Sequence, residues 1–202
     1  MKIVHVETLI SRGAFVESPV WSIIRSSLHA AICAVDWPPG SGSFTIFPES
    51  GRKRGEGNGV KPIKAGLMQH LSDTGWQLEV PLDIGSRKEP GEIDAVLATK
   101  LGLVAVEWET GNISSSHRAL NKMTLGLLTK KLIAGTLVVP SRALYPFLTD
   151  RIGNWDELEP YLPLWKSVPC DVGVLEIVVI EHDATSTDVP RIPKGTSGRA
   201  LQ

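Results

Sequence analysis

Three acidic residues on two neighbouring apolar segments are the side chains best suited to do chemistry in this chain. Asp94 lies in the run 92–98, and Glu107 and Glu109 lie two positions apart in the run 103–109. Because side chains alternate faces along a strand, both glutamates project to the same side. Converging carboxylates on neighbouring strands form a site for hard divalent cations such as Mg²⁺.

The two runs are separated by residues 99–102, and this spacing predicts a β-hairpin with a short loop. Pairing across the turn would bring Asp94 near Glu107 at the far end of the hairpin. Carboxylates crowded there repel one another unless a cation neutralises them. A pair of solvated glutamates on an exposed strand is the alternative, but the flanking residues are apolar on both faces, which favours a buried strand.

These residues resemble a known nuclease motif. Ile93-Asp94, followed by a hydrophobic strand that carries Glu107-Trp108-Glu109, is similar to the PD-(D/E)xK motif in the variant where glutamate replaces the usual lysine. That variant is typical of type II restriction endonucleases of the BamHI and BglII kind. The similarity extends over residues 58–180. The chain departs from the motif's name at Ile93, where the motif has proline, and at Glu109, where it has lysine.

The resemblance implies an endonuclease that depends on Mg²⁺, or Mn²⁺ in its place, and cuts double-stranded DNA at a short palindrome. Asp94, Glu107 and the main-chain carbonyl of Trp108 would hold the metal ion. Glu109 would be either a further metal ligand or the group that orients and deprotonates the attacking water, and both roles stay open. Glu92, two residues before Asp94, is a weaker acidic candidate.

The resemblance also implies an α/β fold with a restriction-endonuclease-like core, in which a mixed central β-sheet is flanked by helices. A two-fold symmetric homodimer would match a palindrome with one active site for each strand. A cognate DNA methyltransferase would be a further partner. Two other functions stay open: a repair, phage or mobile-element nuclease on the same fold, and a catalytically silent DNA-binding module.

Polar and basic residues outside the acidic motif are candidates for DNA contacts, because they are the donor types that bind phosphates or read base edges. The alternative is that they are solvated or paired within the protein, as Arg151 would be with Asp150 or Asp156. Lys61 and Lys64 lie at the start of a predicted helix, where positive charge is unfavourable and an anionic partner would offset the cost. The DNA-binding candidates are Lys61, Arg118, Asn121, Lys122, Arg142, Arg151 and Asn154.

Helices are predicted where apolar residues recur at helical spacing after a capping residue. One begins at Pro19 with Ser18 as its N-cap, a second spans 60–75 and ends at Gly75, and a third spans 113–135 with Asn112 or a following serine as its cap. Strands are predicted at 76–80, 135–141 and 172–180, besides the two strands of the hairpin.

The organisation predicted from composition is one endonuclease-like domain over residues 1–182 and a weakly ordered tail over 183–202. Residues 38–59 are rich in Gly, Pro and Ser and include Arg52-Lys53-Arg54, so they are expected to form a flexible basic loop.

The net charge and the cysteine content limit the classes of protein to which this chain could belong. The net charge is −1, so basic residues for a DNA partner would have to be confined to one cleft. Cys33 and Cys170 form neither a metal-ligand pattern nor a disulfide framework, which favours a cytoplasmic location. No run approaches the roughly 18 apolar residues that a membrane span needs.

Overall fold

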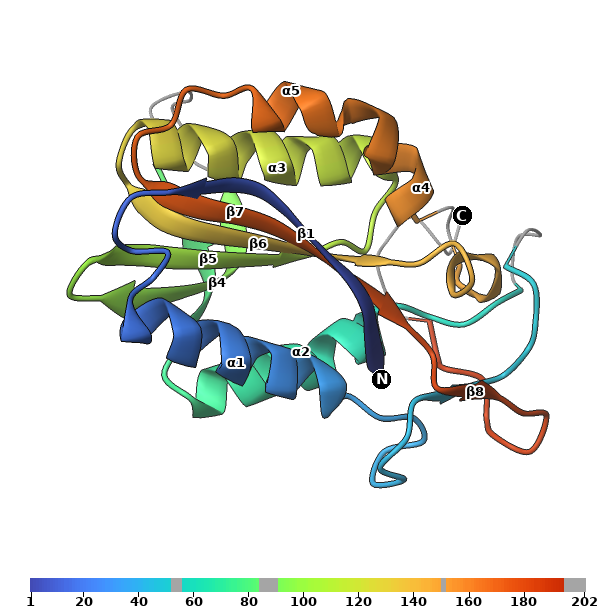
Figure 1. The fold of residues 1–202 in the computed structure, drawn as a ribbon. Helices are drawn as coiled ribbons and strands as arrows, with labels where there is room; N and C mark the ends of the chain where they lie inside the picture. Colours follow the sequence, from blue (N-terminus) through green and yellow to red (C-terminus); the bar gives the residue numbers. More distant parts are fainter. Residues whose placement is uncertain (52–55, 84–90, 150–151, 195–202) are drawn as a thin grey trace.

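The fold is built on one six-stranded mixed β-sheet, as the resemblance implied (Figure 1). The structure is a computed structural model that describes residues 1–51, 56–83, 91–149 and 152–194. The strand order is β1-β7-β6-β5-β4-β3. The strands are β1 (Lys2–Arg12), β3 (Gln77–Pro81), β4 (Glu92–Thr99), β5 (Gly102–Trp108), β6 (Leu132–Pro140) and β7 (Gly173–Glu181).

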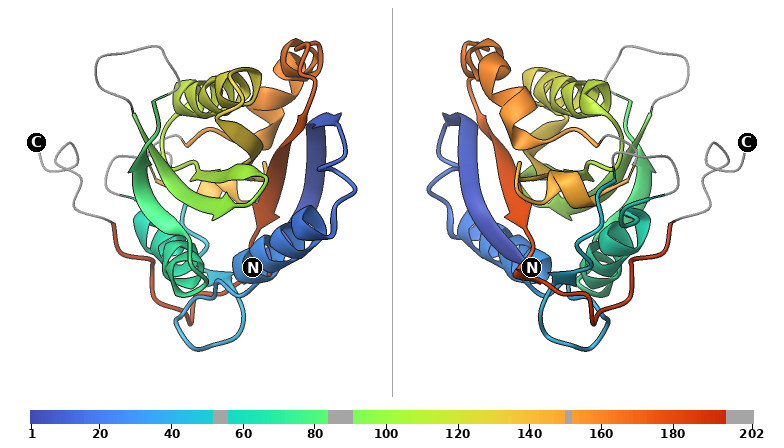
Figure 2. Two further views of the ribbon diagram at one scale, coloured as in Figure 1. Left: turned by 90° about the vertical axis from the view of Figure 1, so that its left-hand side faces the viewer. Right: turned by 90° about the vertical axis from the view of Figure 1, so that its right-hand side faces the viewer.

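Helices cover both faces of the sheet, so the molecule has three layers (Figure 2). The first pair, α1 (Pro19–Cys33) and α2 (Lys61–Asp73), lies on one face. The opposite face carries α3 (Ile113–Leu128), α4 (Trp155–Leu158) and α5 (Leu162–Lys166), and short 3₁₀ helices span Tyr145–Phe147 and Glu159–Tyr161.

The buried side chains form two apolar cores, one on each face of the sheet. Val104 and Val106 belong to one core and Ala105 to the other, which is the alternation expected for a regular buried strand. Both faces of the sheet are therefore buried against apolar side chains. A charged side chain on β5 consequently finds polar partners only at the end of the strand.

The predicted hairpin is confirmed, and its register determines where the acidic residues meet. In the antiparallel pair β4–β5, Ala95 lies opposite Val106, so the next positions along the two strands are Asp94 and Glu107. The pairs β5–β6 and β6–β7 are parallel. α3 makes the crossover from β5 to β6, and its N-terminus consequently lies near the end of β5 that carries the glutamates.

The caps of α1 and α3 agree with the sequence predictions. The Ser18 hydroxyl accepts the Trp21 N–H at 3.2 Å, and Pro19 occupies the first turn of α1. The Asn112 side chain accepts the Ser114 N–H at 3.1 Å at the start of α3. The prediction that this helix continues to residue 135 is wrong, because it ends at Leu128 and the following residues enter β6.

The longest strand, β1, has no counterpart among the sequence predictions. It is an edge strand that pairs with β7 in antiparallel orientation. Its register shifts between Ile3 and His5 and again between Thr8 and Ile10. Such bulges interrupt the alternation of apolar and polar residues, which is the signal by which a strand is recognised in a sequence.

Two segments expected to be flexible contact each other and contribute buried side chains. β2 (Thr45–Ile46) pairs in parallel with β8 (Ala184–Thr185), and Phe44, Ile46 and Ile192 are fully buried. The expectations of a flexible loop over 38–59 and a weakly ordered tail over 183–202 stay predictions, but parts of both segments are fixed by these contacts. The reason is that each segment supplies the hydrogen bonds and apolar contacts that the other lacks. The basic residues 52–54 lie outside the described part of the chain.

Asn58 joins three chain segments at one fully buried position. Its side-chain amide donates to the carbonyls of Phe47 at 2.8 Å and Phe147 at 3.0 Å, and its Oδ1 accepts the Ile192 N–H at 3.1 Å. Its main-chain carbonyl accepts the Thr149 N–H at 2.9 Å. Asn58 therefore joins the segment around Phe47, the segment from Phe147 to Thr149 and the segment around Ile192, just before α2 begins.

A carboxylate at the start of the C-terminal segment is expected to make the stability depend on pH. Asp183 Oδ2 accepts hydrogen bonds from the Met1 ammonium at 2.8 Å and from the Phe44 N–H at 2.7 Å. Burial works to raise the pKa of Asp183, but these partners outweigh it and hold the pKa below its ordinary value of 3.8. The stability that they contribute is present above pH 3.8 and is lost as the pH falls through the lower folded pKa.

We therefore expect Asp183→Asn to lower the free energy of unfolding by about 1 kcal/mol near neutral pH. The difference between variant and wild type should shrink towards zero in strong acid, where Asp183 itself is protonated. Urea unfolding of variant and wild type, near neutral pH and in strong acid, measures this difference in stability. A difference of the same size in acid would contradict the assignment.

Two bulk predictions concern membranes and cysteines. No helix in the described ranges is long and apolar enough to cross a membrane. Cys33 and Cys170 are both free thiols.

Candidate active site

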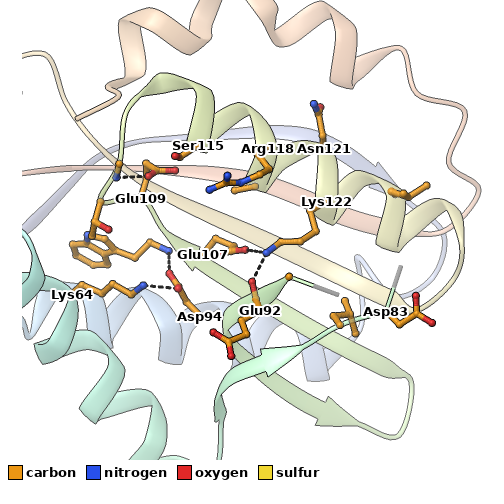
Figure 3. A pocket seen from close by; sticks show the side chains of 17 residues that line it. Lys64, Asp83, Glu92, Asp94, Glu107, Glu109, Ser115, Arg118, Asn121 and Lys122 are labelled. Atoms are coloured by element: carbon orange, nitrogen blue, oxygen red, sulfur yellow. Dashed lines mark hydrogen bonds and ion pairs between the residues drawn. The ribbon is translucent and has the colours of Figure 1, made fainter. Parts of the chain in front are cut away.

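A cavity of about 660 Å³ lies where β4, β5 and α3 meet, and the three predicted acidic residues all line it (Figure 3). Its walls come from the start of β4, the end of β5 with the following turn, and one face of α3. α2 contributes Lys64 from the other layer. Asp94, Glu107 and Glu109 are thus brought together by the hairpin and by the helix that follows it.

Asp94 is held by contacts to both of its carboxylate oxygens. Oδ1 is 2.5 Å from the ammonium nitrogen of Lys64, and Oδ2 accepts the main-chain N–H of Trp108 at 2.8 Å. The N–H of Trp108 comes from the neighbouring strand, so this contact also fastens the open end of the hairpin. The Asp94 side chain is 17% exposed.

Glu107 is paired with Lys122 of α3, and both side chains are largely buried. The Lys122 ammonium also donates to the main-chain carbonyl of Glu92 at 2.5 Å. Burial raises the pKa of Glu107 and outweighs the lowering by Lys122, and the charge on Asp94 raises the pKa further. Glu107 is therefore a desolvated carboxylate with a second negative charge nearby.

Glu109 lies just beyond the end of β5 and is only 8% exposed. Burial raises its pKa despite the hydrogen bond from the Gly111 N–H at 2.5 Å, and the charges on Glu107 and Asp94 raise it further. A Cβ atom at Gly111 would lie 2.9 Å from the Glu109 carboxylate and 2.8 Å from the Ser115 hydroxyl. The turn into α3 can therefore approach Glu109 this closely only because residue 111 is glycine.

The donor set suits a hard divalent cation. Three carboxylates share one cavity, and mutual repulsion contributes to the raised pKa values of Glu107 and Glu109, so a cation would stabilise their charged forms. Within the described ranges, no three His, Cys, Asp or Glu side chains are already arranged as a metal cage. Two of the three carboxylates are instead paired with lysines: the Lys64 ammonium contacts Asp94, and the Lys122 ammonium contacts Glu107.

The residues predicted to bind DNA fall into different environments. Arg118 and Asn121 are exposed on α3 and line the cavity, although Asn121 Oδ1 already accepts the Trp165 indole N–H at 3.0 Å. Lys122 also lines the cavity, but its ammonium is engaged by Glu107. Lys61 is exposed and is not part of the cavity wall.

Three predicted DNA-binding residues come from the segment between β6 and α4. Arg142 is exposed, with its guanidinium 5.1 Å from the centre of the Tyr145 ring. Asn154 is fully buried and its amide donates to Glu157 at 2.7 Å in the cap of α4, so the prediction that it reads a base edge is wrong. Arg151 lies outside the described residues.

Lys64 lines this cavity and pairs with one of its carboxylates, although the sequence did not assign it to the site. Its position at the start of α2 indicated only that an anionic partner would offset an unfavourable charge. The structure identifies that partner as Asp94 rather than solvent. No sequence pattern links the two residues, because they lie 30 positions apart in different layers of the fold.

Comparison with known proteins places the chain among restriction enzymes. A family model described as restriction endonuclease BamHI matches residues 1–199. The type II restriction enzyme OkrAI of Oceanobacter kriegii is 47% identical over 202 residues, which cover all of both chains. The type II restriction enzyme BamHI of Bacillus amyloliquefaciens is 37% identical over 180 residues, 86% of this chain and 80% of that enzyme.

A solved structure agrees with the fold. The restriction endonuclease BglII complexed with a DNA 16-mer superposes with a TM-score of 0.61, covering 95% of this chain and 88% of that chain. The sequence identity is 11%, so this likeness concerns the arrangement of the strands and helices alone.

Proposed function

Because this chain belongs to the restriction endonuclease BamHI family, we propose that it is a type II restriction endonuclease that hydrolyses phosphodiester bonds in double-stranded DNA at a specific sequence. The observation that carries the proposal is the cavity shared by Asp94, Glu107 and Glu109, in a chain whose full-length relative is named a type II restriction enzyme. Converging carboxylates are the donors that metal-dependent phosphodiester hydrolysis requires.

The cofactor of this activity would be a divalent metal ion, and we assign it as Mg²⁺, with Mn²⁺ as a substitute. Asp94 and Glu107 would hold it together with the main-chain carbonyl of Trp108, because hard cations prefer carboxylate and carbonyl oxygens. When bound, the ion would stabilise negative charge on the scissile phosphate and lower the pKa of water.

Glu109 would orient the attacking water. Its position just beyond β5 is fixed by the hydrogen bond from Gly111, and its main-chain N–H donates to the Val138 carbonyl at 3.0 Å. With its main chain fixed to β6 and its carboxylate fixed to the turn, the side chain keeps its direction while a substrate binds. Arg118 is exposed on the same cavity wall, and its guanidinium is suited to contact a DNA phosphate.

The remaining DNA contacts would come from exposed basic residues outside the cavity. Lys61 and Arg142 are both exposed and so remain available to phosphates or base edges, and we retain Arg151 as a candidate from the sequence alone. Lys122 and Asn154 are not included, because the Lys122 ammonium is engaged by Glu107 and Asn154 is fully buried.

We also propose that the protein acts as a homodimer. Tyr161 and Leu164 are 46% and 64% exposed on the outer side of the α3 and α5 layer, and such exposed apolar side chains suit an interface. The His117 ring packs against Tyr161 and Trp165 there, so it acts as a packing residue. Sedimentation equilibrium should give twice the chain mass of 21.9 kDa.

The function is tested by incubating the purified protein with unmethylated plasmid DNA and Mg²⁺, then sequencing the ends of the fragments. Discrete bands with one common end sequence are expected, and chelation of the metal should abolish them. Random fragments would indicate a nuclease without sequence specificity, and intact plasmid would contradict the proposal. The same end sequence would identify the site that a partner methyltransferase has to protect.

A further inference from the structure

We propose that Lys64 is a built-in counter-cation, which occupies the metal-ligating oxygen of Asp94 in the metal-free protein and has to leave it before a metal ion binds. This inference rests on the proposed function, because it concerns the same site. Lys64 would thereby determine when the site takes up a metal ion. Binding of DNA would raise the affinity for metal, and binding of metal would raise the affinity for DNA.

The contact between Lys64 and Asp94 concerns one particular oxygen. Oδ2 of Asp94 accepts the Trp108 N–H at 2.8 Å and is thereby engaged by the neighbouring strand. Oδ1 is the oxygen that faces away from this bond, and it is the one that Lys64 holds at 2.5 Å. Figure 3 shows the Lys64 side chain directed at the Asp94 carboxylate. A cation that uses Oδ1 therefore competes directly with the ammonium group.

The placement of Lys64 is imposed by the helix that carries it. Its neighbour Ile63 is 5% exposed, and Leu67, one turn further on, is fully buried, so α2 is anchored in the core. Lys64 lies in the first turn, where the main-chain N–H groups already make a positive charge unfavourable. Asp94 offsets this cost in the metal-free protein, and another anion would have to offset it after displacement.

The second lysine of the cavity differs from Lys64 in a way that separates their roles. Lys122 contacts the Glu107 carboxylate and also donates to the Glu92 carbonyl, so it joins α3 to the first residue of β4. Among the described residues, the Lys64 ammonium contacts Asp94 alone. Its side chain is 26% exposed, compared with 16% for Lys122. Lys64 is therefore the lysine that is free to leave.

DNA would supply the anion that accepts the displaced ammonium group. A phosphate that enters the cavity brings negative charge next to Lys64, which weakens its hold on Asp94 and so favours metal binding. By linkage, metal binding must favour DNA to the same extent. The protein would consequently bind metal weakly until its substrate is present.

The test is calorimetric titration of the DNA-free protein with Ca²⁺, which measures binding without cleavage, in wild type, Lys64→Met and Lys100→Met. We expect Lys64→Met to bind Ca²⁺ about tenfold more tightly than wild type, because the competing charge is gone. Lys100→Met is the matched control, since it removes an exposed lysine from the closed end of the same hairpin, outside the cavity, and it should bind Ca²⁺ as wild type does.

A second comparison separates competition from a structural effect. Lys64→Arg keeps the positive charge and should keep the weak Ca²⁺ binding of wild type. Adding a DNA duplex should tighten Ca²⁺ binding in wild type, and this gain should be smaller in Lys64→Met. Equal or weaker Ca²⁺ binding by Lys64→Met, with circular dichroism like that of wild type, would overturn the inference; if Lys64→Met does not fold, Lys64→Gln takes its place with the same expectation.

The inference and the proposed function fail in different ways. Wild-type protein that does not cleave plasmid DNA contradicts the proposed function. Wild-type protein that cleaves DNA while Lys64→Met and wild type bind Ca²⁺ equally contradicts only the role of Lys64.

Discussion

Replacing Glu107 by alanine is expected to lower metal-dependent DNA cleavage by about 10³-fold or more, because Glu107 is a proposed metal ligand and the loss of such a ligand removes several kcal/mol of transition-state stabilisation. Specific DNA binding should be retained, since the substitution removes a negative charge and releases the Lys122 ammonium from its ion pair. Plasmid cleavage with Mg²⁺ measures the first effect, and a gel-shift titration without metal measures the second.

The matched control for this experiment is Glu17→Ala, which removes an exposed carboxylate just before α1. It should cleave DNA at the wild-type rate. Glu92→Ala tests the weaker acidic candidate: its side chain is exposed, and Lys122 uses its main-chain carbonyl, so only a small loss of activity is expected. Cleavage retained by Glu107→Ala would exclude Glu107 from the metal site.

Replacing Asn58 by alanine is expected to lower the free energy of unfolding by about 3 kcal/mol, because it removes three side-chain hydrogen bonds of a fully buried residue. The Ile192 N–H loses its acceptor in a buried position, which adds to the cost. The 183–194 segment should become accessible to proteases in this variant, since Asn58 ties it to the start of α2. Urea unfolding and limited proteolysis measure the two effects.

Asn112→Ala provides the comparison, because it also removes an asparagine amide, but an exposed one with a single capping hydrogen bond. Its expected cost is about 1 kcal/mol. If the two asparagine variants lose the same stability, or if residue 192 stays protected in Asn58→Ala, then Asn58 does not hold the segments together.

The hairpin and its carboxylates were predictable from the sequence because the relevant contacts are local. Asp94 and Glu107 are connected by one short turn, and the alternation of apolar residues specifies which positions pair. The caps at Ser18 and Asn112 were predictable for the same reason, since a capping side chain bonds to a main-chain N–H only two or three residues away.

Other parts of the fold were not predictable from local patterns. β1 pairs with the far end of the chain through a bulged register, and Phe44 and Ile192 are buried only because two Gly-, Pro- and Ser-rich segments pack on each other. Asn154 has the side chain of a base reader, yet it is buried in the cap of α4. In each case the outcome depends on a partner that is distant in the sequence.

The acidic residues of the site were therefore determined by the sequence alone, as three carboxylates whose spacing on a buried hairpin requires them to converge. Their charge balance was decided by the tertiary structure. Lys64 and Lys122 reach Asp94 and Glu107 from helices on opposite faces of the sheet, and nothing in their sequence spacing links them to the hairpin. Packing of the two helix layers against one sheet places these cations on the carboxylates, because each lysine is carried to the hairpin by a helix that is anchored in a different core.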